Sequence, residues 1–131
     1  MKTQTLLLAT FACVLLGLSS CTTIAPPAAK GTVDHVVLVW LKRPGNAADR
    51  QALLDAGKEL RSIPGLHFLD QGLALPSERP TVDDSFDVGY VMRFDSPAAL
   101  ETYAKHPLHQ QKVNEVLKPL SRKIVVYDVT R

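Results

Sequence analysis

The alternation of apolar and polar residues predicts four strands. In 33–41 both alternating sets of positions are apolar, so this strand should be covered on both faces. In 86–94 bulky apolar residues stand at every second position, which indicates one buried face. Segments 66–75 and 124–129 complete the set, and residues 70–72 interrupt the former in a way that favours a bulge.

Helical spacing of apolar residues fills the gaps between these strands. Asn46 is a suitable N-cap for a helix that Pro64 and the following glycine end. Ser96 followed by proline begins a short second helix. Pro107 interrupts that helix and begins a third, which reaches about Leu120.

The resulting order, β-α-β-β-α-α-β, predicts an α+β fold with an antiparallel, ferredoxin-like sheet and helices on one face. The strands 33–41 and 124–129 are apolar on both faces, yet one layer of helices covers only one face. A second copy of the chain is the simplest cover for the other face. The pattern therefore predicts a homodimer that forms through its sheet faces.

The first twenty residues are typical of an export signal. Lys2 precedes an apolar run from Leu6 to Leu18, and small residues follow. The run is shorter than the roughly 18 to 20 residues that a membrane-spanning helix needs. We therefore expect residues 1–20 to be removed as a signal peptide.

The segment Leu18-Ser19-Ser20-Cys21 resembles the lipobox of bacterial lipoproteins. This resemblance implies that Cys21 carries lipid and holds the protein on a membrane of the bacterial cell envelope. Residues 21–32 would form a flexible tether and residues 33–131 the folded domain. Thr22 resembles the residue found in lipoproteins that are sent to the periplasmic face of the outer membrane. The alternative is an ordinary secretory peptide, which would leave Cys21 as a free thiol.

Composition narrows the chemistry of the domain. The only other cysteine, Cys13, lies within the signal segment, so the folded part has no thiol for a disulfide, a zinc site or an iron–sulfur cluster. Fifteen basic residues are scattered among thirteen acidic ones, which gives no basic stripe for nucleic acid. No cofactor-binding motif is present, so no cofactor is expected.

Four motifs carry a family resemblance that extends from residue 33 to 129. They are Asp34-His35-Val36-Val37-Leu38, Ile63-Pro64-Gly65, Phe94-Asp95-Ser96 and Tyr103-Ala104-Lys105-His106-Pro107-Leu108-His109. Together they make the chain similar to the stress-responsive α/β-barrel domain family. This resemblance implies a dimeric α/β barrel, in which two ferredoxin-like sheets pack face to face. Most members of that family lack an assigned reaction.

One plant polyketide cyclase of that family uses a tyrosine and a histidine that match Tyr103 and His109. The resemblance therefore implies acid–base chemistry of the aldol type, with His109 as base and Tyr103 as donor to the developing oxyanion. A further pocket histidine of that enzyme is not matched, because Val88 stands at its position. The same substrate is thus not implied.

Two readings of these residues stay open. In the first, the protein binds a small apolar molecule in a barrel pocket without chemistry, Tyr103 packs in the core and His109 orders a helix junction. In the second, it is the acid–base enzyme. A haem- or quinol-directed oxygenase is a third idea, with no supporting motif.

The expected pocket contains His35, Tyr103, His106 and His109. His35 stands in an apolar row of the first strand, where it is either a core residue or a polar point of the pocket. His106 and His109 have the spacing of two metal ligands on one helical face, but no third ligand follows. His106 directly precedes Pro107, which favours a bracing or capping role, and we expect no metal.

Overall fold

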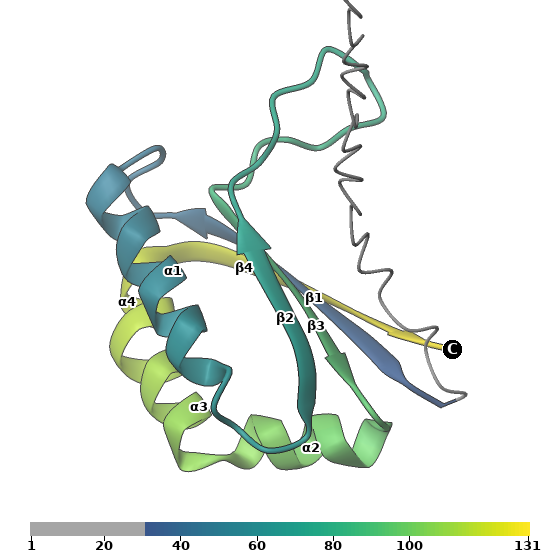
Figure 1. Ribbon diagram of the computed structural model, residues 1–131. Coiled ribbons are helices and arrows are strands. Elements are labelled where there is room, and N and C mark those ends of the chain that lie inside the picture. The colour runs from purple at the N-terminus through teal and green to yellow at the C-terminus, as the bar shows by residue number, and fades with distance from the viewer. Residues whose placement is uncertain (1–30) are drawn as a thin grey trace, which may run out of the picture.

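The computed structural model describes residues 31–131 (Figure 1). Its strands pair antiparallel in one sheet of order β2-β3-β1-β4. The strands are β1 (Val33–Leu41), β2 (Leu66–Gly72), β3 (Val88–Phe94) and β4 (Ser121–Thr130). The helical elements are α1 (Ala47–Leu60), α2 (Pro97–Lys105), α3 (Pro107–Lys112), the π-helical η1 (Val113–Leu117) and α4 (Lys118–Leu120). The helices lie on one face of the sheet, so the expected ferredoxin-like α+β fold is confirmed (Figure 1).

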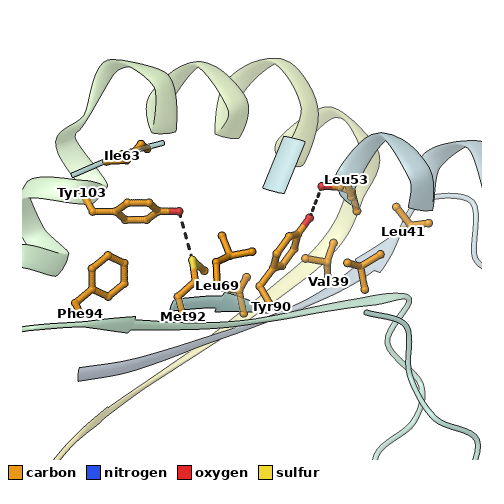
Figure 2. Packing of buried hydrophobic residues seen from close by; sticks show 11 residues of the cluster. Val39, Leu41, Leu53, Ile63, Leu69, Tyr90, Met92, Phe94 and Tyr103 are labelled. Atoms are coloured by element: carbon orange, nitrogen blue, oxygen red, sulfur yellow. Dashed lines mark hydrogen bonds between the residues drawn. The ribbon is translucent and has the colours of Figure 1, made fainter. Parts of the chain in front are cut away.

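The first strand is one of the two inner strands of the sheet, as its two apolar faces predict. It has the expected bounds and lies between β3 and β4. Its helix-facing side chains Val37, Val39 and Leu41 belong to one buried cluster with residues of β3, α1 and α2. Figure 2 shows this cluster between the sheet and the helices.

Helix α1 begins as its sequence predicts. The Asn46 side chain accepts a hydrogen bond from the Asp49 amide at 3.0 Å and thereby caps the helix. The helix ends at Leu60, a few residues before the expected end at Pro64. Ile63 belongs to the turn instead, where it is buried in the core, and Gly65 closes the turn with a positive φ of 85°.

The second strand is shorter than the expected 66–75. It ends at Gly72, because Gly72 makes the last pair with β3, opposite Gly89. The register shift lies at its start, between Leu66 and Phe68, and not at residues 70–72. The loop that follows rises away from the sheet (Figure 1).

The third helical segment contains one wide turn. In η1 the amide of Lys118 donates to the carbonyl of Val113, five residues earlier. Pro119 explains this turn, because proline has no amide hydrogen to donate and its ring clashes with the carbonyl four residues earlier. The chain then enters β4 at Ser121, three residues before the expected start of the last strand.

The face of the sheet away from the helices carries exposed apolar side chains. The register places four of them on this face: Phe68, Val91, Tyr127 and Val129. We call these residues the open-face cluster. No helix within residues 31–131 is long and apolar enough to cross a membrane. The signal peptide and Cys21 lie outside the described residues.

Candidate functional site

A cavity of about 60 Å³ lies between the sheet and the helices α1, α2, α3 and η1. This volume has room for a few water molecules or for part of a small ligand. The lining is mainly aliphatic, with a few polar groups, as is usual in small-molecule sites. The lining residues are His35, Val37, Leu53, Ala56, Gly57, Leu60, Tyr90, Met92, Tyr103, His109, Lys112, Val113 and Leu117.

Tyr103 projects from the last turns of α2 into the core and is 1% exposed. Its hydroxyl donates to the sulfur of Met92 at 3.4 Å (Figure 2). A thioether is a weak acceptor, so this donor is held loosely for a buried hydroxyl. Burial raises the pKa of Tyr103, which keeps the phenol protonated. The cavity therefore contains a neutral O–H donor that lacks a strong partner.

Tyr90, on β3, provides an internal comparison. Its hydroxyl donates to the backbone carbonyl of Leu53 at 2.8 Å, so this donor is fully satisfied by the protein (Figure 2). Both phenols line the same cavity and both have a pKa raised by burial. They differ in their acceptors, and only Tyr103 offers a weakly bound hydrogen to a ligand.

His109 packs directly against Tyr103, with ring centroids 4.6 Å apart. Its Nδ1 lies 3.0 Å from the carbonyl oxygen of Ala104, which can only accept, so Nδ1 carries the hydrogen. In the neutral ring Nε2 is then the basic nitrogen. Burial lowers the pKa of His109, as do His35 and His106 by charge, against an opposing contribution from the Ala104 carbonyl. His109 is therefore a neutral base near pH 7.

The helix break brings Tyr103 and His109 together. His106 is both the C-cap of α2 and the N-cap of α3, and its Nδ1 accepts a hydrogen bond from the Leu108 amide at 3.2 Å. The capping role expected from its position before Pro107 is confirmed. His106 is not among the residues that line this cavity, because its ring accepts a hydrogen bond from the helix backbone.

His35 lines the cavity from β1. Its Nδ1 lies 2.5 Å from an oxygen of Asp128 on β4, directly opposite in the sheet. The carboxylate accepts the hydrogen of Nδ1 and so orients the imidazole. The edge of the ring also contacts the Phe94 ring, with centroids 6.2 Å apart. His35 therefore lines the cavity with a second imidazole of fixed orientation. The sequence did not predict its partner Asp128.

Lys112 is a further lining residue that the sequence motifs did not indicate. It follows His109 by three residues, which places both side chains on one face of α3. This three-residue spacing from His109 is the sequence feature that could have indicated Lys112 as a lining residue. Within residues 31–131 no group of three histidine, cysteine, aspartate or glutamate side chains could hold a metal ion.

Together these features define an α+β protein of ferredoxin-like fold with a small, partly polar cavity under its helices. The family model described as "Stress responsive A/B Barrel Domain" matches residues 33–131. The chain belongs to this family, as its motifs implied. A comparison with curated proteins finds no match.

Solved structures share the fold. A ferredoxin-like protein of the same family from Mesorhizobium loti is 28% identical, with a TM-score of 0.64 over 78% of this chain and 98% of that one. A hydroxynitrile lyase from Passiflora edulis is 20% identical, with a TM-score of 0.68 over 79% and 95%. A dimeric ferredoxin-like protein of unknown function from Thermobifida fusca is 17% identical, with a TM-score of 0.64 over 78% and 92%.

Proposed function

We propose that the protein binds a small carbonyl compound with an apolar body in the cavity and transfers a proton at the carbon next to the carbonyl. One observation carries this proposal: the weakly held Tyr103 hydroxyl and the neutral imidazole of His109 line the same cavity in contact with each other. The aliphatic lining favours the apolar body of such a ligand. The lyase among the structural neighbours is an enzyme with this fold.

The chemistry follows from the protonation states. Nε2 of His109 accepts the proton from carbon, and the electron pair of the broken C–H bond forms an enolate. The Tyr103 hydroxyl exchanges its weak Met92 acceptor for the enolate oxygen, where it stabilises the developing charge. Return of the proton from His109 to a different carbon completes an isomerisation. Alternatively, the enolate carbon attacks a second carbonyl of the same molecule, and the alkoxide that forms takes the proton back from His109, which completes an aldol-type cyclisation.

The test is hydrogen–deuterium exchange in D₂O, followed by NMR, at the carbons beside the ketone of 4-oxopentanoate and of its methyl ester. We expect the protein to accelerate exchange above the buffer rate. His109→Ala should reduce the acceleration by about 10²- to 10⁴-fold. Tyr103→Phe should reduce it by about 10²- to 10³-fold. The surface variant Glu101→Gln serves as the control.

Binding alone is the second candidate function, and the largely aliphatic lining favours it. Ligand bound to protein purified from its native membrane, identified by mass spectrometry, would reveal this role. If the ligand is retained equally by wild type and His109→Ala, and if neither ketone exchanges faster than in buffer, the catalytic proposal is wrong and binding stands.

We propose further that the chain is exported and lipid-anchored through Cys21, on the periplasmic face of the outer membrane. The lipobox-like sequence before Cys21 and the apolar run before that support this location. Metabolic labelling with a clickable fatty acid should mark the wild type and not Cys21→Ser. Equal labelling of both would overturn the anchor. Membrane fractionation of the labelled protein then tests its location.

Self-association through the sheets is supported by the open-face cluster. Phe68, Val91, Tyr127 and Val129 leave apolar surface in water, each with more than two fifths of its area exposed. Three structural neighbours are described as dimeric. We expect light scattering to give twice the chain mass for the wild type and the single mass for Val91→Asp. A single mass for the wild type would contradict this proposal.

A further inference from the structure

One lysine of this domain differs from the others in its surroundings. Lys112 lines the cavity, its side chain is 16% exposed, and its Nζ lies 2.6 Å from the Glu59 carboxylate on α1. By contrast, Lys58 and Lys105 pair with acids of their own helices and are 60% and 73% exposed. Such exposed ion pairs contribute little to the free energy of unfolding. Lys112 instead places a cationic group beside the site, largely out of water.

The ammonium of Lys112 has capacity for another partner. It carries three N–H donors, and the Glu59 carboxylate is its one ion-pair partner within residues 31–131. The Glu59 side chain is 56% exposed and does not line the cavity, so it meets the ammonium from the solvent side. Glu59 can therefore swing into water without disturbing the core, which would leave the ammonium free for a ligand.

The charge of the lining points the same way. The ionisable side chains that line the cavity are two histidines, two tyrosines and Lys112, with no carboxylate among them. The two acids nearby, Asp128 and Glu59, lie behind His35 and Lys112 respectively. A cavity whose charged group is an ammonium favours a ligand with a negative charge.

We propose that Lys112 is the anion-binding group of this cavity and that the ligand is a small carbonyl compound bearing a carboxylate. This inference rests on the proposed function, because it places the ligand's carbonyl at Tyr103 and His109. The ligand's carboxylate then reaches the ammonium of Lys112 at the edge of the cavity and displaces Glu59. His109 and Lys112 are three residues apart on α3, so one helix face would hold both ends of the ligand.

The probes are 4-oxopentanoate and its uncharged methyl ester, which share the reacting ketone. For the wild type we expect kcat/KM for exchange to favour the acid by at least about tenfold, as a charge-assisted contact implies. In Lys112→Met, which keeps the length and apolar stem, this preference should disappear through a higher KM for the acid. Lys105→Met, on the surface, is the matched control and should keep the preference.

Removal of the competing carboxylate provides an independent readout. Glu59→Gln should bind 4-oxopentanoate several-fold more tightly in an NMR titration, because the ammonium no longer has a charged partner to lose. If Lys112 only braces α1 against α3, Glu59→Gln would instead lower thermal stability without tightening binding. That result would overturn the proposal.

The outcomes separate this inference from the proposed function. Exchange without preference for the acid overturns the role of Lys112 and leaves the proton-transfer proposal standing. Lys112-dependent binding of the acid without exchange supports the anion site and overturns the proton transfer. If neither 4-oxopentanoate nor its methyl ester binds, in titrations up to millimolar concentration, the proposal for Lys112 is overturned.

Discussion

The aromatic rings of Tyr103 and His109 pack at 4.6 Å between centroids, although the two residues are six positions apart in a largely helical segment. In one continuous helix this spacing would rotate the second side chain by about 240° relative to the first and place it on a different face. The extended backbone of His106, with φ −63° and ψ 136°, separates α2 from α3 and removes that constraint. A break in the helix thus creates the site.

The pH dependence of proton exchange should reflect the lowered pKa of His109. Its basic form is the unprotonated ring, so exchange should fall as the pH drops through its pKa. Burial lowers that pKa below the usual value near 6.5, so activity should persist to lower pH than an ordinary histidine allows. A pH–rate profile and an NMR titration of the His109 ring proton measure this. An inflection above pH 6.5 would contradict the expectation.

The two buried phenols should respond in opposite ways to loss of their hydroxyls. Tyr90→Phe removes a strong hydrogen bond to the Leu53 carbonyl and should cost about 1 kcal/mol of unfolding free energy, with exchange activity retained. Tyr103→Phe removes only a contact to sulfur, so stability should change by less than about 0.5 kcal/mol while activity falls. Urea unfolding and the exchange assay check both. A large stability loss in Tyr103→Phe would indicate a structural hydroxyl.

Gly57 should not tolerate a side chain, although alanine favours helices. A Cβ at this position would lie 1.9 Å from Oε1 of Gln71 and 2.7 Å from the ring of Tyr90. We expect Gly57→Ala to destabilise the fold by about 1–3 kcal/mol despite a helix-propensity gain of about 1 kcal/mol. The double variant Gly57→Ala/Gln71→Ala should recover part of the loss. Thermal unfolding of the wild type and of both variants measures this. A double variant that is no more stable than Gly57→Ala would refute the clash with Gln71.

Asp87 should be a strong determinant of stability away from the cavity. Its buried carboxylate accepts from the amides of Leu41 and Gly45 and from Arg50. Burial alone would raise its pKa, but these donors outweigh it and the pKa is lowered. Asp87→Ala should cost about 2–4 kcal/mol at pH 7, since it leaves three donors without their acceptor.

The sign of the pH effect gives a second check on Asp87. A lowered folded-state pKa contributes stability above the unfolded value near 3.9, and this contribution is lost as the pH falls through the folded pKa. The stability difference between wild type and Asp87→Ala should therefore narrow in strong acid. Glu78→Ala, in the exposed loop, should change stability by less than about 0.5 kcal/mol at any pH.

Local signals made much of the fold predictable. The doubly apolar segment 33–41 gave the central strand with its bounds, and Asn46 and Ser96 marked helix starts that the structure confirms through their side-chain caps. The end of β2 was less predictable, because β2 ends where the neighbouring strand β3 no longer offers a pairing partner. The π-turn in η1 follows from Pro119, which has no amide hydrogen to donate.

The site was predictable in its motif residues and not in their partners. Tyr103, His109 and His35, which the family motifs and the strand alternation indicate as candidates, line one cavity. The acceptors that set their chemistry lie on other elements or on the backbone: Met92, Asp128 and the carbonyl of Ala104. These contacts depend on strand register and on the angle of the helix break, which single-sequence patterns do not specify.

The double role of His106 limits how this sequence can change in length. His106 alone connects α2 to α3, so the connection has no additional residue that could absorb a change in length between Tyr103 and His109. An inserted or deleted residue there would turn α3 by about 100° and carry His109 away from its neighbour. The largely exposed residues 73–81, at the start of the loop between β2 and β3, are under no such restriction. Variation in length should therefore accumulate in that loop, while the count from Tyr103 to His109 stays fixed.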